Sequence, residues 1–441
     1  MKKAFELKEI YKALIQKPLE IKDLDAFYID ANKARGEKTR SKLSLLLKNN
    51  MDINQHVLFI GYRGCGKSTE LNHLEKDIQD DFLVINYSVF DELDPNNFNY
   101  IELVIVTMQK LFLLVKDSNV NLDTEYIDSI DSFFKITETV EVDETATDAK
   151  IEAGAKAGAK IPFIADFFVK LTASIKASNS IKKTTKEKYE PKFSTLLNHC
   201  NNLISQIRNN LGNLNKKDIL IIIEDLDKAN LSQSESLFYE YANQITSLRT
   251  NIVFTFPVAL KNNSKFKTIE NYFSNTYELP MIMISDKKAN KVEKGVQTML
   301  EIVESRMSID LFENESILQN LICYSGGCLR DLFSMISDAG ENAMVEDRNK
   351  ITMEDEKYAY NKIKKGYKNT IADVLEKENV IIKAEEFYEV LNKLNENAKK
   401  TIDNTRIELI LLQNLSILGY NGEGWFDVHP IVKDILKYRN S

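Results

Sequence analysis

The chain has 441 residues, of which 43% are hydrophobic and 28% charged, and its formal net charge is −8. This length predicts two to four domains with sizeable cores, and the negative charge disfavours nucleic acid and acidic membranes as partners. The four cysteines show neither disulfide nor zinc spacing, the N-terminus lacks the apolar core of a signal peptide, and no run reaches the ~20 apolar residues of a spanning helix. These features predict a protein of the reducing cytoplasm.

Residues 1–50 are expected to form a helical or linker segment, and the first strong signal follows it. An apolar run, His56-Val-Leu-Phe-Ile, turns directly into the pattern G-x-x-x-x-G-K-S, and helical spacing begins at Thr69. Glycines permit a tight loop whose backbone N–H groups face a phosphate chain, a lysine reaches the outer phosphates, and a serine hydroxyl ligates Mg²⁺. The N-terminus of the following helix favours the same anion. The alternative is a glycine turn in another α/β protein.

We therefore predict a loop that binds ATP or ADP together with Mg²⁺. Its candidate nucleotide-binding residues are Gly61, Arg63, Gly64, Cys65, Gly66, Lys67, Ser68 and Thr69. Within this set, Lys67 is expected to contact the outer phosphates, and the Ser68 hydroxyl is expected to be a metal ligand.

The stretch between Ser68 and Ile219 is longer than a phosphate-binding core needs, so we expect an insertion at about 118–190. Acidic residues dominate 121–148, Ala-Gly-Ala-Lys occurs twice at 153–160, and the segment that follows is apolar nearly all round. Pro162 is well placed to begin a helix there. Such a helix must bury most of its surface. It would pack on its own domain, on another subunit or partner, or at a membrane surface.

A second signal lies at the end of a buried strand. The run Ile219-Leu-Ile-Ile-Ile predicts a strand covered on both faces, and Glu224 and Asp225 follow it directly. In P-loop ATPases, acidic groups hold the Mg²⁺ shell and orient the attacking water. We assign Glu224 to the metal and Asp225 to the water, with exchanged roles or slow hydrolysis as alternatives because a Glu stands first. Asp227 is a weaker third candidate, and a solvated acidic turn is the non-functional interpretation.

Two further polar positions complete a plausible site. Residues 251–256 form another short apolar strand, where Thr255 would contact the γ-phosphate or the water, or simply fill the strand. Later, Ser325-Gly-Gly precedes a helix that carries Arg330 in its first turns. An arginine there can reach the phosphates from a separate domain and so couple the bound nucleotide to the domain angle. The alternative for Arg330 is an ordinary surface position.

The C-terminal part, 367–441, alternates helical spacing with a hairpin signal. Tyr420-Asn-Gly is a strong turn sequence between apolar flanks, and helices followed by a β-wing indicate a winged-helix-like domain. Residues 371–441 hold nine Lys and Arg against twelve Asp and Glu. Because DNA binding depends on clustered cations, this excess of acid favours a protein partner over nucleic acid.

These motifs, in this order, resemble the AAA+/STAND branch of P-loop ATPases. The lid pattern G-x-x-R from Gly327 to Arg330 is similar to that of origin-recognition-type ATPases, and Glu224-Asp-Leu-Asp-Lys resembles the acidic motif of KAP-type ATPases. The resemblance implies an α/β fold: a P-loop ATPase core (parallel sheet with helices on both faces), then a helical lid and a winged-helix-like domain. We place the core at 51–285, the lid at 286–366 and the last domain at 367–441.

The resemblance also implies roles for single residues. Tyr28 or Arg35, upstream of the first strand, would stack on the adenine. Arg249 or Arg306 would be the arginine that completes the site of a neighbouring subunit. His429 lies in a segment similar to the M-H-D segment of STAND proteins and would help to hold the ADP-bound form, although Val428 and Pro430 replace the flanking Met and Asp; packing inside the domain is the alternative.

Three functions remain open on this basis. The first is an ATP-binding and ATP-hydrolysing switch or assembly ATPase, whose partner is a second copy of itself or an effector protein. Because bacterial STAND-like ATPases often serve in defence, the resemblance implies an anti-phage (antiviral) or signalling role. The second is a DNA-associated, origin-recognition-like loader, and the third a nucleotide-binding scaffold with little turnover.

Overall fold

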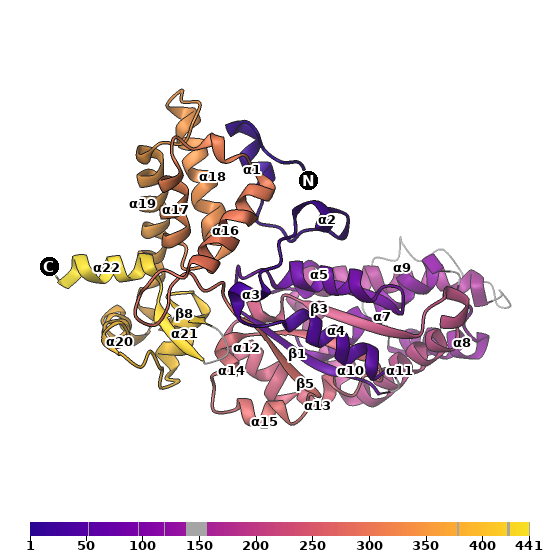
Figure 1. Ribbon diagram of the computed structural model, residues 1–441. Coiled ribbons are helices and arrows are strands. Elements are labelled where there is room, and N and C mark those ends of the chain that lie inside the picture. Colours follow the sequence, from indigo (N-terminus) through magenta and orange to yellow (C-terminus); the bar gives the residue numbers. More distant parts are fainter. Residues whose placement is uncertain are drawn as a thin grey trace.

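The structure is a computed structural model that describes residues 1–51, 53–95, 97–118, 120–137, 157–376, 379–420 and 424–440 (Figure 1). Three sequence features lie wholly or partly outside this range: residues 138–148 of the acidic stretch 121–148, the first Ala-Gly-Ala-Lys at 153–156, and the hairpin turn after Tyr420. Among the described residues, no helix is both long enough and apolar enough to cross a membrane.

Five parallel strands form the central sheet in the order β2-β3-β4-β1-β5. They are β1 (His56–Gly61), β2 (Phe82–Ser88), β3 (Asp218–Glu224), β4 (Asn251–Phe256) and β5 (Asn275–Leu279). Branched and aromatic residues fill β1, β3 and β4, and the side chains of 219–223 are fully buried. Such near-continuous apolar runs are typical of parallel strands covered on both faces. The predicted α/β fold class is confirmed.

The strand order brings the two phosphate-site motifs to one edge of the sheet. β4 pairs with β1 on one side and with β3 on the other. Because parallel strands end at the same edge, the loop after β1 and the acidic turn after β3 both emerge there, separated by one strand. Helix α5 (Lys67–Ile78) begins directly at the end of the loop.

The insertion forms a helical layer at the far end of the core, on the right in Figure 1. It contains α8 (Thr124–Thr137), α9 (Ala157–Ala177) and α10 (Asn179–Tyr189), and it packs with the flanking helices α7 (Tyr100–Ser118) and α11 (Phe193–Asn209). Helix α9 begins before Pro162, not at it as the sequence suggested. The rings of Phe112 and Phe168 stack at 5.4 Å, so α9 buries its apolar face against α7 within the chain. Intramolecular packing, the first of the three predicted alternatives, therefore accounts for α9.

Shorter helices connect the strands of the core and precede it. They are α1 (Ile10–Ala13), α2 (Leu24–Phe27), α3 (Asn32–Arg35), α4 (Thr39–Asn49), α6 (Val89–Glu92), α12 (Leu231–Glu235), α13 (Ala242–Ile245), α14 (Val258–Lys261) and α15 (Phe266–Glu270).

Four helices follow the core and form the lid at the upper left of Figure 1: α16 (Glu293–Arg306), α17 (Glu315–Tyr324), α18 (Leu329–Val345) and α19 (Met353–Thr370). The N-terminal segment packs on this lid rather than on the sheet. The Ala4 amide donates to the Arg306 carbonyl at 2.8 Å, and Ile10 of α1 lies against Gly340 of α18, where a methyl group would already crowd it. The chain therefore begins on the lid and crosses to the core.

The C-terminal part contains β6 (Val374–Glu376), β7 (Asn379–Ile382), α20 (Ala384–Glu396), α21 (Arg406–Gln413), β8 (Ile417–Tyr420), β9 (Trp425–Val428) and α22 (Pro430–Asn440). Strands β8 and β9 pair antiparallel after two helices, as in a winged-helix domain. Thr405 caps α21 and forms a reciprocal capping box with Glu408, which explains where this helix begins. The described residues thus form the three-part architecture predicted from the motifs.

Candidate nucleotide-binding site

The loop after β1 has the backbone that its glycines permit. Gly64 and Gly66 adopt φ angles of 76° and 98°, which residues with a β-carbon rarely reach. The lid lies directly on this loop: a β-carbon at Gly64 would come within 2.7 Å of Arg330 Cβ and 2.8 Å of Cys328 Sγ. The glycine thus serves both the loop conformation and the close approach of α18.

Lys67, the first residue of α5, is buried and fully engaged. Its Nζ donates to the carbonyls of Gly61 at 2.7 Å and Tyr62 at 2.9 Å, and lies 3.0 Å from Asp227 Oδ2. Burial alone would lower the pKa of Lys67, but the charge of Asp227, the hydrogen bond to it and the neighbouring Cys65 together outweigh burial, and the pKa is raised. The ammonium therefore keeps its charge at the floor of the loop, where phosphate oxygens can replace the carbonyls.

The acidic turn after β3 faces this lysine. Glu224 is buried and accepts hydrogen bonds from the Ser68 hydroxyl and the Asn86 amide, and burial raises its pKa to about 7. Asp225 adopts a left-handed φ of 69°, and its carboxylate accepts from Ser88 Oγ at 2.7 Å and pairs with Lys228 Nζ at 2.5 Å. The structure thus joins Ser68 to Glu224, two of the three metal candidates from the sequence, and the third candidate, Asp225, lies next to Glu224.

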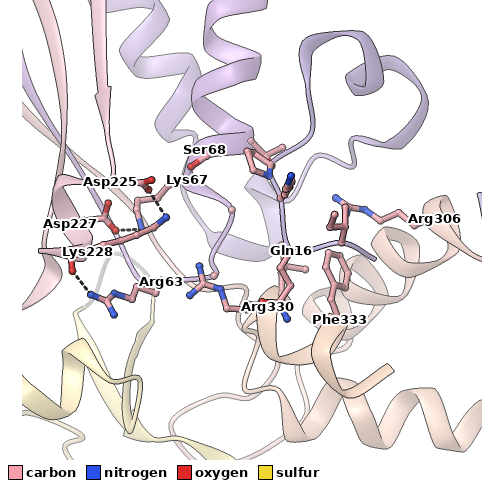
Figure 2. A pocket seen from close by; sticks show the side chains of 17 residues that line it. Gln16, Arg63, Lys67, Ser68, Asp225, Asp227, Lys228, Arg306, Arg330 and Phe333 are labelled. Carbon is pink, nitrogen blue, oxygen red and sulfur yellow. Dashed lines mark hydrogen bonds and ion pairs between the residues drawn. The ribbon is translucent and has the colours of Figure 1, made fainter. Parts of the chain in front are cut away.

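Asp227 holds a more central position than the sequence suggested. It pairs with Lys67 and lines the pocket together with Asp225 (Figure 2). From the spacing Glu-Asp-Leu-Asp alone, Asp227 is only the third acidic candidate. The short turn Leu226–Lys228, which the sequence does not reveal, brings it back toward the loop. Thr255 does not reach the pocket: its hydroxyl accepts from the Leu226 amide at 3.1 Å and donates to the Ile223 carbonyl at 3.3 Å. It holds the acidic turn in place rather than facing a phosphate.

The pocket between loop and lid is strongly cationic. Six positively charged side chains line it, against two negatively charged ones: Lys17, Arg63, Lys67, Lys228, Arg306 and Arg330 against Asp225 and Asp227. Arg330 extends from α18 toward the loop, and Arg63 donates to the Lys228 carbonyl at 2.7 Å (Figure 2). Burial lowers the pKa of Arg63, and the nearby positive charge of Arg330 acts in the same direction. Such crowding of cations favours a polyanionic ligand.

The other end of the pocket contains residues that the sequence analysis missed. Ile15, Gln16 and Pro18 of the N-terminal segment line it on one side, and Leu329 and Phe333 of the lid line it on the other. Leu329 and Phe333 precede and follow Arg330 by one and three positions, so helical spacing could have pointed to Phe333. No local pattern marks residues 15–18, because only packing on the lid brings them there.

Tyr28 and Arg35, expected near an adenine, serve the core instead. The Tyr28 hydroxyl donates to the Glu70 carboxylate at 3.1 Å, and its ring lies beside His73 of α5. The Arg35 guanidinium is buried and donates to the Cys65 carbonyl at 2.6 Å and to the Pro280 carbonyl. Arg35 therefore fixes the backbone of the phosphate loop from behind. Likewise, Thr69 Oγ1 accepts from the Leu19 amide at 3.2 Å and ties the N-terminal segment to α5.

Three other candidates do not take the positions expected of them. Arg249 is exposed just before β4, at the sheet edge opposite the phosphate loop. Arg306, expected to reach a neighbouring subunit, is 6% exposed and lines the pocket of its own chain. His429 is fully buried at the interface of lid and C-terminal part, stacked on Tyr367 at 4.5 Å, with Nε2 3.2 Å from Asp331 Oδ2. It packs inside the molecule and does not line the pocket.

Comparisons with known proteins concern the fold. No protein-family model matches the chain, and neither does any curated protein sequence. Among solved structures, 83 chains match. The Walker-type ATPase PABY2304 of Pyrococcus abyssi shares 12% identity, with 96% of this chain and 99% of that chain covered and a TM-score of 0.44. The Aeropyrum pernix ORC2 protein in ADPNP–ADP complexes shares 12%, covering 97% and 98%, with a TM-score of 0.43. Cdc6p of Pyrobaculum aerophilum shares 10%, covering 97% and 98%, with a TM-score of 0.41.

Proposed function

We propose that the protein is an ATP-binding and ATP-hydrolysing switch of the reducing cytoplasm that couples the bound nucleotide to association with a partner. One observation carries the proposal: a left-handed glycine loop and its Lys67 face Asp225 and Asp227 across a pocket that Arg330 of the lid closes. Backbone N–H groups and cations bind phosphates, and carboxylates orient the attacking water. Because Arg330 belongs to the lid, loss of the γ-phosphate changes what holds the lid to the core.

The donor set fits Mg²⁺ as the metal that accompanies the nucleotide. This ion keeps several waters and substrate oxygens and takes only one or two protein groups, so a large cluster of carboxylates is not required. Ser68 and Glu224 are hydrogen-bonded to each other and would hold the ion, and Asp225 would orient the attacking water. When bound, the ion neutralises charge on the phosphates.

The C-terminal part is placed to respond to the site. The Gly419 amide of β8 donates to the hydroxyl of Tyr62 in the phosphate loop, and the Tyr420 hydroxyl donates to the Gly326 carbonyl of the lid at 2.8 Å. Core, lid and C-terminal part, which we delimit at 51–285, 286–366 and 367–441, therefore meet beside the pocket. A change of lid angle would expose surface on these parts to a second copy or to an effector.

The proposal is tested by nucleotide binding and turnover. We expect Lys67→Ala to weaken ATP binding by about tenfold to a hundredfold, because a charge-assisted contact to the phosphates is lost. Asp225→Asn should lower hydrolysis by about a hundredfold while ATP still binds, since it removes a water-orienting carboxylate. ATP affinity unchanged in Lys67→Ala would refute the site. Turnover unchanged in Asp225→Asn and Glu224→Gln would leave a scaffold that binds nucleotide.

Partner association has its own measurement. The mass of the purified protein in the apo, ADP-bound and non-hydrolysable-ATP states reports assembly directly. We expect a larger species in one nucleotide state, and an invariant monomer would remove self-assembly and leave an effector as the partner.

The anti-phage role rests on the resemblance to STAND ATPases alone. Protection of bacteria by the wild-type chain but not by Lys67→Ala would support it, and equal phage sensitivity of both strains would end it.

One surface observation keeps the DNA-associated alternative. A groove between α19 and α22 is lined by Lys364, Lys365, Lys368 and Arg439, with Tyr388 and Tyr438 between them, and no acidic residue lines it within the described chain. Lys364 and Arg439 are paired with Asp434 and Glu385 behind it. Duplex binding below micromolar that weakens steeply with salt and with Lys365→Glu would favour the loader. Absence of such binding at low salt would exclude it.

A further inference from the structure

Arg306 is a buried cation with no carboxylate in contact among the residues that the structure describes. It is the last residue of α16, is 6% exposed, and its Nε and Nη1 make no hydrogen bond to any described residue. Burial lowers its pKa to about 10. Asp23, the acid that acts against this shift, is itself paired with the Met1 amino group at 2.7 Å. A buried charge left without partners is costly to the fold, so its position calls for a ligand.

The geometry holds this guanidinium firmly at the end of the pocket away from the phosphate loop. Its central carbon lies 4.6 Å from the centre of the Phe333 ring, and its backbone carbonyl accepts from the Ala4 amide. Figure 2 shows Arg306 and Phe333 at one end, Lys67 and Ser68 at the other, and Arg330 with Gln16 between them. A nucleotide with its phosphates at Lys67 would extend its sugar and base toward Arg306.

Two other roles fit these observations less well. Arg348 of the lid pairs with Asp355 at 2.6 Å and Arg35 bonds two backbone carbonyls, whereas Nε and Nη1 of Arg306 have no partner among the described residues. An arginine acting on a neighbouring subunit would be exposed, whereas Arg306 is enclosed by its own pocket. The Arg306 side chain lines the same pocket as Lys67 and Arg330.

We propose that Arg306 reads the base of the bound nucleotide, donating from its guanidinium to ring acceptors of a purine while Phe333 holds the guanidinium in place. The proposal rests on the proposed function and specifies what the far end of that same site does. Guanidinium has donors only, so it requires acceptors such as purine ring nitrogens. Guanine offers N7 and O6 side by side, and adenine offers N7 beside an amino group. Parallel titrations with ATP and GTP identify which purine the pocket prefers.

The test separates the base from the phosphates. In Arg306→Met, which keeps most of the volume, we expect the preferred purine triphosphate to bind about tenfold weaker or worse, as for a lost charge-assisted hydrogen bond. Inorganic tripolyphosphate, which has no base, should compete for the loop as well as in the wild type. Lys67→Ala should weaken both ligands, and Arg406→Ala, which removes an exposed arginine of α21, should weaken neither.

Each other outcome has a definite meaning. Equal loss for triphosphate and tripolyphosphate in Arg306→Met would place Arg306 at the phosphates and overturn the proposal, as would no loss at all. Failure of the wild type to bind either ligand would instead refute the nucleotide site itself. A structural role is checked without nucleotide: removing an unpaired buried charge should not lower the melting temperature, and a large drop would show that Arg306 supports the lid.

Binding of chemically altered nucleotides completes the test, because there the ligand is changed and the wild-type protein is not. The ligands are triphosphates of the preferred purine in which CH replaces one ring nitrogen, at position 1, 3 or 7. Each of them lacks one hydrogen-bond acceptor of the parent base. We expect at least one of them to bind the wild type about tenfold weaker than the parent nucleotide, and to bind Arg306→Met no weaker than the parent does. If all of them bind the wild type as well as the parent nucleotide, Arg306 does not read a ring acceptor.

Discussion

At the scale of single residues, Glu224 combines burial with a functional position. Its pKa is raised from 4.5 to about 7, with burial as the main cause, so the folded protein holds this proton more tightly than the unfolded chain. Stability from this group is fully present below about pH 4.5 and is lost as the pH rises through about 7. At about 1.4 kcal/mol for each unit of pKa shift, the loss is on the order of 3 kcal/mol.

The free energy of unfolding of the wild type should therefore fall between pH 5 and 8, and we expect this fall to be smaller in Glu224→Gln. Denaturant titration without metal or nucleotide measures it. Glu102 of α7 is a matched control, because burial raises its pKa to about 7 as well and it does not line the pocket. Glu102→Gln should flatten the same fall and leave ATP hydrolysis unchanged, whereas Glu224→Gln should affect both. Equal pH slopes for the wild type and Glu224→Gln would contradict the burial argument.

At the scale of elements, strand β8 fits against the phosphate loop with no space to spare. A β-carbon at Gly419 would lie inside van der Waals contact with the Tyr62 hydroxyl. We expect Gly419→Ala to destabilise the protein by about 1–3 kcal/mol, as overpacking does, and to raise protease sensitivity at the β8–β9 hairpin.

Gly366 of α19 has open space around its β-position, so Gly366→Ala should stabilise by up to about 1 kcal/mol. The same sign for both substitutions would contradict this difference.

The elements also show what the sequence can predict. The strands at 56–60, 219–223 and 251–256 carry local signals, because a buried parallel strand needs continuous apolar residues and a phosphate loop needs glycines. Their order in the sheet follows from the fold class that those signals indicate. The base end of the pocket carries no such signal. Gln16 and Arg306 meet only because the N-terminal segment packs on the lid, a contact between residues nearly 300 positions apart.

Errors in the predicted site have the same origin. The resemblance to AAA+ ATPases places Tyr28 or Arg35 at the adenine, yet partners on other elements decide their roles: Cys65 and Pro280 for Arg35, Glu70 for Tyr28. Thr255 illustrates the same point, since its hydroxyl is used by the backbone of the neighbouring strand. Residue type and spacing identify which groups can bind a phosphate, and long-range contacts decide which of them do.

At the scale of the whole molecule, the three parts are joined at one turn of the lid. Gly326 accepts from Tyr420 of β8, Cys328 Sγ lies 3.8 Å from the Arg63 carbonyl of the phosphate loop, and Asp331 accepts from Tyr367 Oη at 2.6 Å beside the buried His429. Arg330 stands in the middle of this turn and faces the pocket. Movement of the lid relative to the phosphates therefore disturbs contacts to both neighbouring parts.

The phosphate loop gives this coupling a direct route. Lys67 Nζ bonds to the carbonyls of Gly61 and Tyr62, and the Tyr62 hydroxyl accepts from Gly419 of β8. A bound triphosphate competes for Lys67 and so alters the backbone that carries Tyr62. We expect ATP to change the hydrogen exchange of the β8 backbone amides in the wild type, because local opening depends on such contacts. Lys67→Ala should abolish the change, and the peptide of α15, which lies away from the pocket, should show none in either protein. ATP binding that leaves β8 exchange unaltered would mean that the C-terminal part does not sense the nucleotide through this loop.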